Sequence, residues 1–422
     1  MAEEKLVCRH VYKIFGPEPE QALEMLQNGK SKEAILNETG MTVGVQDTNF
    51  TVKQGEIFVV MGLSGSGKST LVRMLNRLID PTSGEIFIDG EEITGANMEA
   101  VRQIRLRKMA MVFQHFALFP HQTVAENVAY GLKIQGVDEA TRREKALTAL
   151  KQVGLDAWAD RPPNALSGGM QQRVGLARGL AAEPEVLLMD EPFSALDPLI
   201  RRDMQDELIE LQKSMHKTII FITHDLDEAL ILGDRIAIMK DGRFVQVGTA
   251  QEIVSNPSDD YVAAFTNGID RGRVYSVDYV MQTPETIDLA SDTLQVALDK
   301  LDSLDRDGIY VMDGDKIAGA VTHADVAHAL SKGTTDLKSV IRKDYPTTKP
   351  DVYLHEIYER CTYAVPVAVL DDDGKLVGAV DPRHVFAKLV PDSEMPSEKA
   401  AREQQENQGQ APAGAASASA TA

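Results

Sequence analysis

A glycine-rich stretch near the start of the chain carries the residue types that hold phosphate. Residues 62–69 read "GLSGSGKS". The glycines let the backbone curl so that its N–H groups surround an anion, while a lysine reaches the terminal phosphates and a serine hydroxyl helps to hold Mg²⁺. A helix that opens at Lys68 would point its N-terminus at the same anion. The stretch predicts a nucleotide phosphate site that consists of Gly62, Ser64, Gly65, Ser66, Gly67, Lys68, Ser69 and Thr70.

Two acidic residues supply a second part of such a site. Asp190 and Glu191 close the apolar run "EVLLMDE" at residues 185–191. Carboxylates at the end of a buried strand are costly unless positive charge meets them there, and phosphate-bound Mg²⁺ would meet them. We therefore expect Asp190 to hold Mg²⁺ and Glu191 to orient and polarise an attacking water.

Strands and helices must position these residues, and as far as about residue 267 short apolar runs alternate with longer helical stretches. This alternation is typical of an α/β layer architecture, and near-continuous Val, Ile, Leu and Met runs suit strands covered on both faces. Residues 123–135 and 141–155 read as helices of a separate lobe, and residues 17–40 read as a helical insertion. The expected strands are 56–62, 108–114, 185–191, 217–225 and 235–242.

An internal repeat follows at residues 278–390. "DKIAGAV" (315–321) recurs as "GKLVGAV" (374–380), and each copy has an apolar run before it and a helical stretch after it. Two copies predict a pair of small α/β units packed on one another, because one unit of that size would bury little surface. The last segment, 391–422, has few large apolar side chains, and we expect it to be disordered.

Composition excludes several classes of function. The formal net charge of −20 and the pI of about 4.9 disfavour nucleic acid as a partner, because non-specific binding to phosphates needs basic surface. Cys8 and Cys361 are too few for a disulfide framework or a cysteine metal site. No apolar run approaches the roughly 20 residues that span a bilayer, so we expect any membrane role to come through a partner.

The order of the motifs resembles the ATP-binding subunit of ABC transporters, over roughly residues 5–265. The series comprises "GLSGSGKS", Gln114, "LSGGMQQR" (166–173), "LLMDE", "SALD" (194–197) and His224. The resemblance implies a P-loop NTPase fold in an ATPase domain at 1–267, with a helical subdomain at about 115–180. It also implies ATP hydrolysis with Mg²⁺. A soluble ABC ATPase of DNA repair or translation would need a long coiled coil, two cassettes or basic surface, which the sequence lacks.

The resemblance assigns roles to residues outside the phosphate loop. It implies a homodimer in which Ser167, Gly168 and Gly169 of one copy contact the ATP held by the other, and in which Asp197 acts across the interface. Gln114 would bind Mg²⁺, sense the attacking water and connect to the membrane partner, and His224 would contact the γ-phosphate. Phe15 is the candidate for stacking on adenine, with Tyr12 as a rival and a plain core aromatic as the alternative for either.

Further features resemble the ATPase subunit of glycine betaine/proline (quaternary-amine) importers. These are the insertion at 17–40, the run "FSALDPLIRRDMQDEL" and a C-terminal module that looks like a tandem CBS pair. This resemblance implies a membrane permease partner, a substrate-binding protein that acts indirectly, and a peripheral location on the cytoplasmic face of the membrane. The alternative is an importer of another small solute, such as methionine, in which the module serves only dimerisation.

The CBS-like module contains one match to a ribose-binding pattern. "GAVTHAD" (319–325) fits G-x-x-T-x-x-D, with Thr322 and Asp325 as contacts for a nucleotide. The second copy departs from the pattern, because Asp381 stands where threonine is expected and His384 where aspartate is expected. One adenosine-type pocket is therefore conceivable, and a purely structural role is the equal alternative.

Overall fold

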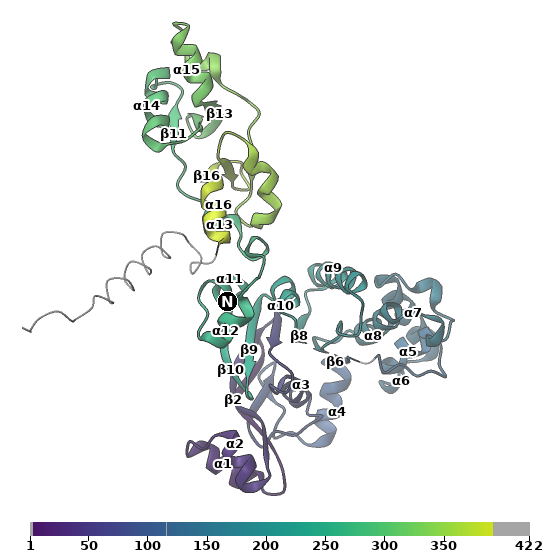
Figure 1. Cartoon of the computed structure of the whole chain (residues 1–422). Helices are drawn as coiled ribbons and strands as arrows, with labels where there is room; N and C mark the ends of the chain where they lie inside the picture. The colour runs from purple at the N-terminus through teal and green to yellow at the C-terminus, as the bar shows by residue number, and fades with distance from the viewer. Residues whose placement is uncertain (1–2, 115, 391–422) are drawn as a thin grey trace, which may run out of the picture. The chain divides into compact units, whose positions relative to one another are not determined.

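The computed structural model describes residues 3–114 and 116–390 of the chain. The segment 391–422, for which the sequence predicts disorder, lies outside these residues. The chain divides into two compact units, Met1–Ile269 and Asp270–Ala422 (Figure 1). Both units mix helices with strands, which confirms the predicted α/β class.

A six-stranded sheet forms the centre of the first unit, in the order β10-β9-β3-β8-β7-β6. Five strands run parallel, and β10 pairs antiparallel with β9 at the edge. Every residue of β3, β7 and β8 is buried, as their unbroken apolar runs predict. The five predicted strands are confirmed, and the six bounds are β3 (Ile57–Met61), β6 (Met109–Val112), β7 (Val186–Asp190), β8 (Thr218–Thr223), β9 (Arg235–Lys240) and β10 (Arg243–Gly248).

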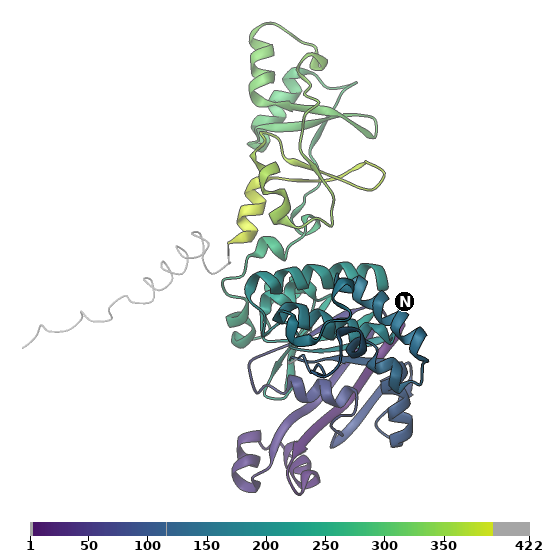
Figure 2. The same cartoon turned by 90° about the vertical axis from the view of Figure 1, so that its right-hand side faces the viewer.

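A second, antiparallel sheet carries the helical insertion. Its order is β2-β1-β4-β5, and α1 and α2 lie between β1 and β2 in the chain, at one end of these long strands (Figure 2). The Ser31 hydroxyl caps α2 and Gly40 ends it in the left-handed conformation, and two helices therefore lie within residues 17–40. The bounds are β1 (Glu4–Phe15), β2 (Thr42–Lys53), β4 (Ser83–Ile88), β5 (Glu91–Glu92), α1 (Pro19–Gln27) and α2 (Lys32–Thr39).

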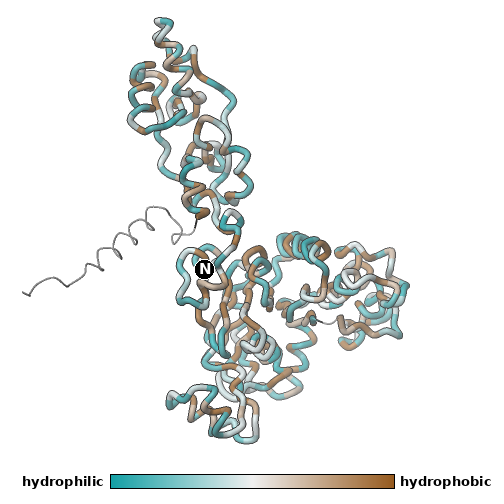
Figure 3. The backbone as a smooth tube through the Cα atoms, in the orientation of Figure 1, coloured by the Kyte–Doolittle hydropathy of each residue, from teal (hydrophilic) through white to brown (hydrophobic). Residues whose placement is uncertain are grey.

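Several helices of the first unit lie beside the sheets. Figure 3 shows hydrophilic and hydrophobic residues mixed along the chain, as expected for elements with one solvated side. α3 presents Leu71, Val72 and Leu75 to the core beside the central strands. The helices that flank the sheets are α3 (Lys68–Leu75), α4 (Met98–Arg107), α9 (Pro198–Met215), α10 (Leu226–Leu232), α11 (Ala250–Ser255) and α12 (Asp260–Thr266).

Four further helices pack mainly on one another. α5 contacts α7 and α8, and α7 contacts α8, while α8 also packs on β6 of the central sheet. The predicted helices at 123–135 and 141–155 both occur in this group. Its members are α5 (Val124–Val128), α6 (Tyr130–Ile134), α7 (Glu139–Gln152) and α8 (Gly168–Ala181), with the short 3₁₀ turns η1 (Asp156–Trp158) and η2 (Pro163–Ala165).

The second unit repeats one small α/β arrangement. Each half has a three-stranded sheet in which the first two strands are parallel and the last two antiparallel, followed by a helix. This agreement in order and direction confirms the predicted internal repeat. The first half has β11 (Thr286–Asp288), α14 (Leu294–Leu304), β12 (Gly308–Asp313), β13 (Lys316–Thr322) and α15 (His323–Ser331). The second has β14 (Thr347–Thr348), η5 (Leu354–Thr362), β15 (Val367–Leu370), β16 (Leu376–Val380) and α16 (Pro382–Leu389). The connecting turns are η3 (Arg271–Arg273), α13 (Val277–Val280) and η4 (Leu337–Val340).

Within 3–114 and 116–390, no helix has both the length and the apolar character needed to cross a membrane.

Candidate functional site

The candidate site lies at one edge of the central sheet. β3, β8, β7 and β6 are parallel neighbours, so their carboxyl ends meet there. Met61 pairs with Thr223, and Asp190 pairs with Ile222. Three parts of the site therefore lie next to one another at this edge: the phosphate loop that begins at Gly62, the acidic pair and His224. Ligands of open α/β sheets bind outside this edge.

The phosphate loop is shaped by glycines that cannot be replaced without strain. Gly62, Gly65 and Gly67 have φ angles of 153°, 79° and 106°. A Cβ on Gly62 would lie 2.2 Å from the carbonyl oxygen of Met239, and one on Gly67 would lie 2.4 Å from that of Gly44. The loop is thus held against the ends of β9 and β2. α3 starts at Lys68 without a side-chain cap, which leaves its first N–H groups for a ligand.

Lys68 is folded into the loop that it follows. Its side chain is 4% exposed, and Nζ donates hydrogen bonds to the carbonyl oxygens of Gly62 (2.8 Å) and Leu63 (3.1 Å). The same Nζ lies 3.8 Å from Oε1 of Glu191. Burial lowers the pKa of Lys68, and the charges of Glu191 and Asp190 oppose that shift. The ammonium group is therefore largely shielded from solvent, between the phosphate loop and Glu191.

Ser69 and Asp190 form an oxygen-rich pair beside the loop. The Ser69 hydroxyl donates a hydrogen bond of 2.8 Å to Oδ1 of Asp190, whose other oxygen is 3.4 Å from a guanidinium nitrogen of Arg73. Asp190 is 5% exposed. Arg73 belongs to none of the sequence motifs, although its position one turn after Ser69 on α3 predicts that it lies beside that serine.

Glu191 connects the loop to His224. Its Oε2 lies 3.0 Å from Nδ1 of His224, and its backbone N–H bonds to the carbonyl oxygen of Ile222 (3.0 Å). Glu191 has a φ of 47°, in the left-handed region that costs a residue with a Cβ. That conformation turns the carboxylate out of the strand, with Lys68 on one side and His224 on the other. His224 is half exposed, so its ring can meet a ligand.

Gln114 lies in the same row of strand ends. Val112 of β6 and Met189 of β7 are paired in adjacent parallel strands. Gln114 lies two residues after Val112, and Glu191 lies two residues after Met189, so both come at the same level beyond the sheet. Its side chain is exposed.

Ser167, Gly168 and Gly169 lie at the start of α8 and belong to the helical group. Ser167 is exposed and caps α8 by accepting from the N–H of Met170 (3.4 Å). Gly169 is buried, and a Cβ there would lie 2.4 Å from Cγ2 of Ile200, on α9. α8 is therefore packed closely against α9, whose exposed cap Asp197 accepts from the N–H of Ile200 (3.1 Å). The "LSGGMQQR" and "SALD" stretches therefore lie close together, because the first turns of α8 and α9 pack on each other.

Phe15 ends β1 and is 41% exposed, with the ammonium of Lys13 5.2 Å from the centre of its ring. A Cβ on Gly44 would lie 2.9 Å from the Phe15 ring, and a Cβ on Gly67 of the phosphate loop would lie 2.4 Å from the carbonyl oxygen of Gly44. Tyr12 instead lines a hollow with the insertion, and Asp47 helps burial to raise its pKa. Phe15 is therefore the aromatic joined to the phosphate loop through Gly44.

The residues at this edge fit a magnesium nucleotide. Hard oxygen ligands are present at Ser69 and Asp190, and Ser66 Oγ is buried with no hydrogen-bond partner among the described residues. Within that part of the chain, no group of three or more His, Cys, Asp or Glu could hold a metal ion by itself. A cation here would need the serine hydroxyl and phosphate oxygens as further ligands, which is the usual manner of Mg²⁺.

Comparison with known proteins agrees with this geometry. The family model "ABC transporter" matches residues 45–194, and the model "CBS domain" matches residues 337–391. The glycine betaine transport ATP-binding protein OpuAA of Bacillus subtilis is 50% identical over 89% of this chain and 90% of its own length. The glycine betaine/proline betaine transport system ATP-binding protein ProV of Escherichia coli is 47% identical over 89% and 95%. The chain belongs to the family of glycine betaine ABC transporter ATP-binding proteins.

A solved structure points to the same fold for the first unit of this ATP-binding protein. CbiO1 of Clostridium perfringens, part of the ABC transporter complex CbiONQ, matches with a TM-score of 0.51 and 28% identity, over 61% of this chain and 92% of its own. As a member of the family, the chain binds ATP and is an ATP hydrolase coupled to transport.

In the second unit of the ATP-binding protein, Arg342 binds the aspartate of the ribose-binding pattern at residues 319–325. The Thr322 hydroxyl bonds to Oδ2 of Asp325 (2.8 Å), and Arg342 donates to both oxygens of that carboxylate at 2.5 Å and 2.9 Å. In the second copy, Asp381 caps α16 and lies 3.7 Å from Nε of Arg306. Asp325 in the first copy and Asp381 in the second are thus each paired with an arginine.

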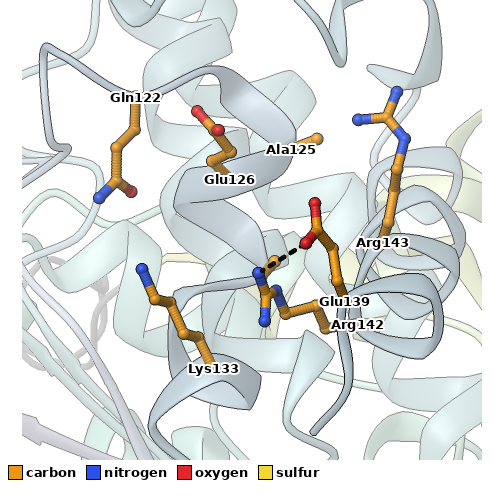
Figure 4. Close-up of a pocket in the computed structure, with 8 residues that line it drawn as sticks. Gln122, Ala125, Glu126, Lys133, Glu139, Arg142 and Arg143 are labelled. Atoms are coloured by element: carbon orange, nitrogen blue, oxygen red, sulfur yellow. Dashed lines mark ion pairs between the residues drawn. The ribbon is translucent and has the colours of Figure 1, made fainter.

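The helical group of the ATP-binding protein contains a separate small hollow of about 160 Å³ (Figure 4). Lys133, Arg142 and Arg143 bring positive charge to it, but Arg142 pairs with Glu139 (3.8 Å) and Arg143 with Asp160 (2.8 Å). Its lining contains none of the phosphate-loop residues. We read it as a solvated surface hollow.

Proposed function

We propose that this chain powers the import of glycine betaine/proline-type compatible solutes through a partner permease, under osmotic control through its CBS module. The observation that carries the proposal is the close similarity to OpuAA and ProV over almost the whole chain, including the second unit. The relatives also include choline and trimethylamine N-oxide transport ATP-binding proteins. These names share a quaternary or fully methylated amine, and none of them supports methionine as the solute.

We assign a task to each group of the ATP site. The loop glycines and Ser64, Ser66 and Thr70 place backbone and hydroxyl donors around the phosphates, and Lys68 balances their charge. Phe15 stacks on adenine. Glu191 orients and polarises the attacking water, because its carboxylate stands between Lys68 and His224 at the strand end. His224 contacts the γ-phosphate with the ring edge that Glu191 does not use.

Ser69, Asp190 and Gln114 hold Mg²⁺ in this proposal. Ser69 and Asp190 are already joined by a hydrogen bond, and Gln114 lies two residues beyond the neighbouring strand β6. When bound, the cation neutralises charge on the phosphate oxygens.

A homodimer completes each ATP site. Ser167, Gly168 and Gly169 lie on a helix start whose N–H groups suit a phosphate, and both Ser167 and Asp197 are exposed on the first unit. We assign these residues to the ATP held by the partner copy. ATP then joins the two subunits, and hydrolysis releases them.

The permease docks beside Gln114 in this proposal. A groove of about 270 Å³ lies between β6, α6 and α8, and its lining includes Leu78, Arg105, Met111, Phe113 and Arg178. Leu78 is 51% exposed. Arg178 also holds the backbone after Gln114, through the carbonyl oxygens of Phe116 (3.1 Å) and Ala117 (2.7 Å). A permease segment seated here would press on the chain beside Gln114 and keep the ATPase at the cytoplasmic face of the membrane. The substrate-binding protein acts only through the permease.

The domain plan follows the family pattern. We assign the ATPase domain to 1–267, its helical subdomain to about 115–180 and the tandem CBS module to 278–390. Because Arg342 holds Asp325 through two hydrogen bonds, a nucleotide at Thr322 and Asp325 would have to displace that guanidinium. Ligand sensing at this position would therefore require that the Arg342–Asp325 pair break.

Uptake in cells tests the proposal. We would delete the gene, restore it as wild type or as Glu191→Gln, and measure labelled glycine betaine and labelled methionine uptake at low and high external salt. We expect the wild type alone to restore glycine betaine uptake, with stimulation by salt. Restoration of methionine uptake, or of neither solute, would overturn the solute assignment. Salt-independent uptake would overturn the osmotic control.

A further inference from the structure

Four side chains behind His224 form a cluster that the ATP site does not use. We call Arg201, Thr223, Asp225 and Glu228 the clamp. The Thr223 hydroxyl donates to Oε2 of Glu228 (2.6 Å) and accepts from the N–H of Asp225 (3.0 Å). Arg201 donates to Oδ2 of Asp225 (3.2 Å), and its Nε lies 3.8 Å from Oε1 of Glu228.

Two members of the clamp are almost completely buried, so their hydrogen bonds and ion pairs are shielded from water. Glu228 is 4% exposed and Thr223 is 1% exposed. Burial raises the pKa of Glu228, while the Thr223 hydroxyl and the Arg201 charge lower it. Gln205, on α9, adds a hydrogen bond of 3.3 Å to Oε1. Burying the Glu228 carboxyl group costs free energy unless hydrogen-bond and charge partners surround it. Displacing any one of these partners is therefore unfavourable, and Glu228 keeps them in place.

The clamp joins the two segments that carry His224 and Asp197. His224 lies between Thr223 and Asp225 in the chain. Thr223 is held by its hydrogen bond to Glu228, and Asp225 by its hydrogen bond from Arg201. On its other side, Arg201 donates to the carbonyl oxygen of Leu196 (3.3 Å), the residue before Asp197. α9 and α10 are in contact (Figure 1). The start of α9 and the turn before α10 are therefore tied through one guanidinium.

We propose that Arg201 and Glu228 are positioning residues for ATP hydrolysis, which set the distance between the His224 turn and the Asp197 turn. The proposal rests on the roles given above to His224 and Asp197. The clamp residues contact neither the phosphate loop nor Phe15 through any described hydrogen bond or ion pair. Loosening the clamp should therefore lower kcat and leave the affinity for Mg-ATP almost unchanged.

Thr223 provides the mildest test, because valine has nearly the same shape and lacks the hydroxyl. For Thr223→Val in the full chain, we expect kcat to fall by roughly ten- to a hundredfold, since small misplacements of reacting groups are costly. The KM and the Kd for Mg-ATP should stay within about twofold of the wild type. Thr223→Ser, which restores the hydroxyl, should recover most of kcat. Arg201→Met should show the same split, and its effect should not multiply with that of Thr223→Val if both act through one cluster.

Two variants of α9 separate positioning from stability. Leu208→Ala removes a buried side chain (2% exposed) and lowers the melting temperature without touching the clamp. Lys213→Ala removes an exposed ion pair with Glu210. Both should keep kcat at 25 °C.

Two results would overturn the proposal: an unchanged kcat in Thr223→Val and Arg201→Met, or a loss of kcat in Leu208→Ala that equals theirs at equal melting temperature. Glu191→Gln, run in parallel, identifies the other failure. If that variant hydrolyses ATP normally, the proposed site is wrong, whatever the clamp variants do.

Discussion

Glu191 combines a strained backbone conformation with the side-chain contacts that the proposed site uses. A residue with a Cβ at a φ of 47° directly after a buried strand is strained, and the strain persists because neighbouring groups fix it. The carbonyl of Glu191 accepts from the hydroxyl of Ser194 (3.0 Å), while its carboxylate meets Lys68 and His224. The conformation therefore holds the carboxylate between Lys68 and His224, where the proposed site needs an acceptor for the attacking water.

Glu191→Gln tests this assignment. The amide keeps the shape and the contact with His224, but it is a poor proton acceptor. We expect kcat for ATP to fall by about a hundredfold or more, as for the loss of a general base, with Mg-ATP affinity retained. Steady-state ATPase assays together with calorimetric binding would show the split. Hydrolysis within a few-fold of the wild-type rate would exclude Glu191 as the residue that orients water.

Lys68→Ala should affect the opposite parameter. Nζ of Lys68 is the buried positive charge nearest to the loop carbonyls of Gly62 and Leu63, so its removal takes away attraction for phosphate. We expect the Kd for Mg-ATP to rise by tenfold or more, since a charged hydrogen bond contributes on the order of 2 kcal/mol. Fluorescent-nucleotide titration measures this directly. An unchanged Kd would remove Lys68 from the phosphate site.

At the scale of elements, the phosphate loop depends on what lies behind it. Gly67 has no room for a side chain, because a Cβ would lie 2.4 Å from the carbonyl oxygen of Gly44. Gly90 has a comparable positive φ of 72°, but nothing lies within 4 Å of its Cβ position. The pair therefore separates backbone strain from a clash with β2.

Gly67→Ala should damage nucleotide binding, and Gly90→Ala should not. Both substitutions strain a left-handed residue by about 1 kcal/mol. Only Gly67→Ala must also push the loop away from β2, so we expect a large loss of Mg-ATP affinity in that variant alone. Thermal unfolding and nucleotide titration of both proteins check this. Equal binding by the two variants would mean that the loop does not rely on its contact with Gly44.

The start of α15 offers a prediction about pH. The hydrogen bonds from Arg342 hold the pKa of Asp325 below its ordinary value of 3.8. A folded pKa below the unfolded one means that the pair stabilises the second unit above pH 3.8, and that this stabilisation disappears as the pH falls through the folded pKa. Arg342→Met should lower stability by no more than about 1 kcal/mol at neutral pH, because the pair is partly exposed. The difference from wild type should close in acid, as measured by calorimetry at several pH values. A constant difference across this range would assign the effect to packing.

The elements and the contiguous motifs could be predicted from the sequence. The central strands are unbroken apolar runs, and "GLSGSGKS" places its glycines, lysine and serine within eight consecutive residues, so local pattern is enough. The contacts that tie the motifs together could not be predicted. Arg201 and Asp225 are 24 positions apart, and Arg342 and Asp325 are 17 apart. Such residue types are common on surfaces, and only the packing of the elements that carry them decides which ones meet.

At the scale of the whole molecule, the position of Ser167 decides how many chains one ATP needs. Ser167 and Gly169 start α8 in the helical group, whereas Lys68 and Glu191 lie at the edge of the central sheet. If Ser167 completes the site of a partner copy, Lys68→Ala and Ser167→Arg break different halves of the same composite site. Each variant alone should be almost inactive, because a symmetric homodimer carries the defect in both sites.

Mixing the two inactive variants should restore activity. In a mixed dimer, the intact Lys68 of one chain faces the intact Ser167 of the other, so one of the two sites is whole and the second contains both defects. Half of the dimers are mixed at equal concentrations, and we expect up to about a quarter of the wild-type ATPase rate if the sites act independently. A mixture of Lys68→Ala with Glu191→Gln is the control, because both defects lie in the same half and no whole site can form. Recovery in the control as well would mean that contamination accounts for the activity. No recovery in the first mixture, with exchange of subunits verified by differently tagged chains, would place Ser167 in the same site as the Lys68 of its own chain and would remove the reason for a composite dimer.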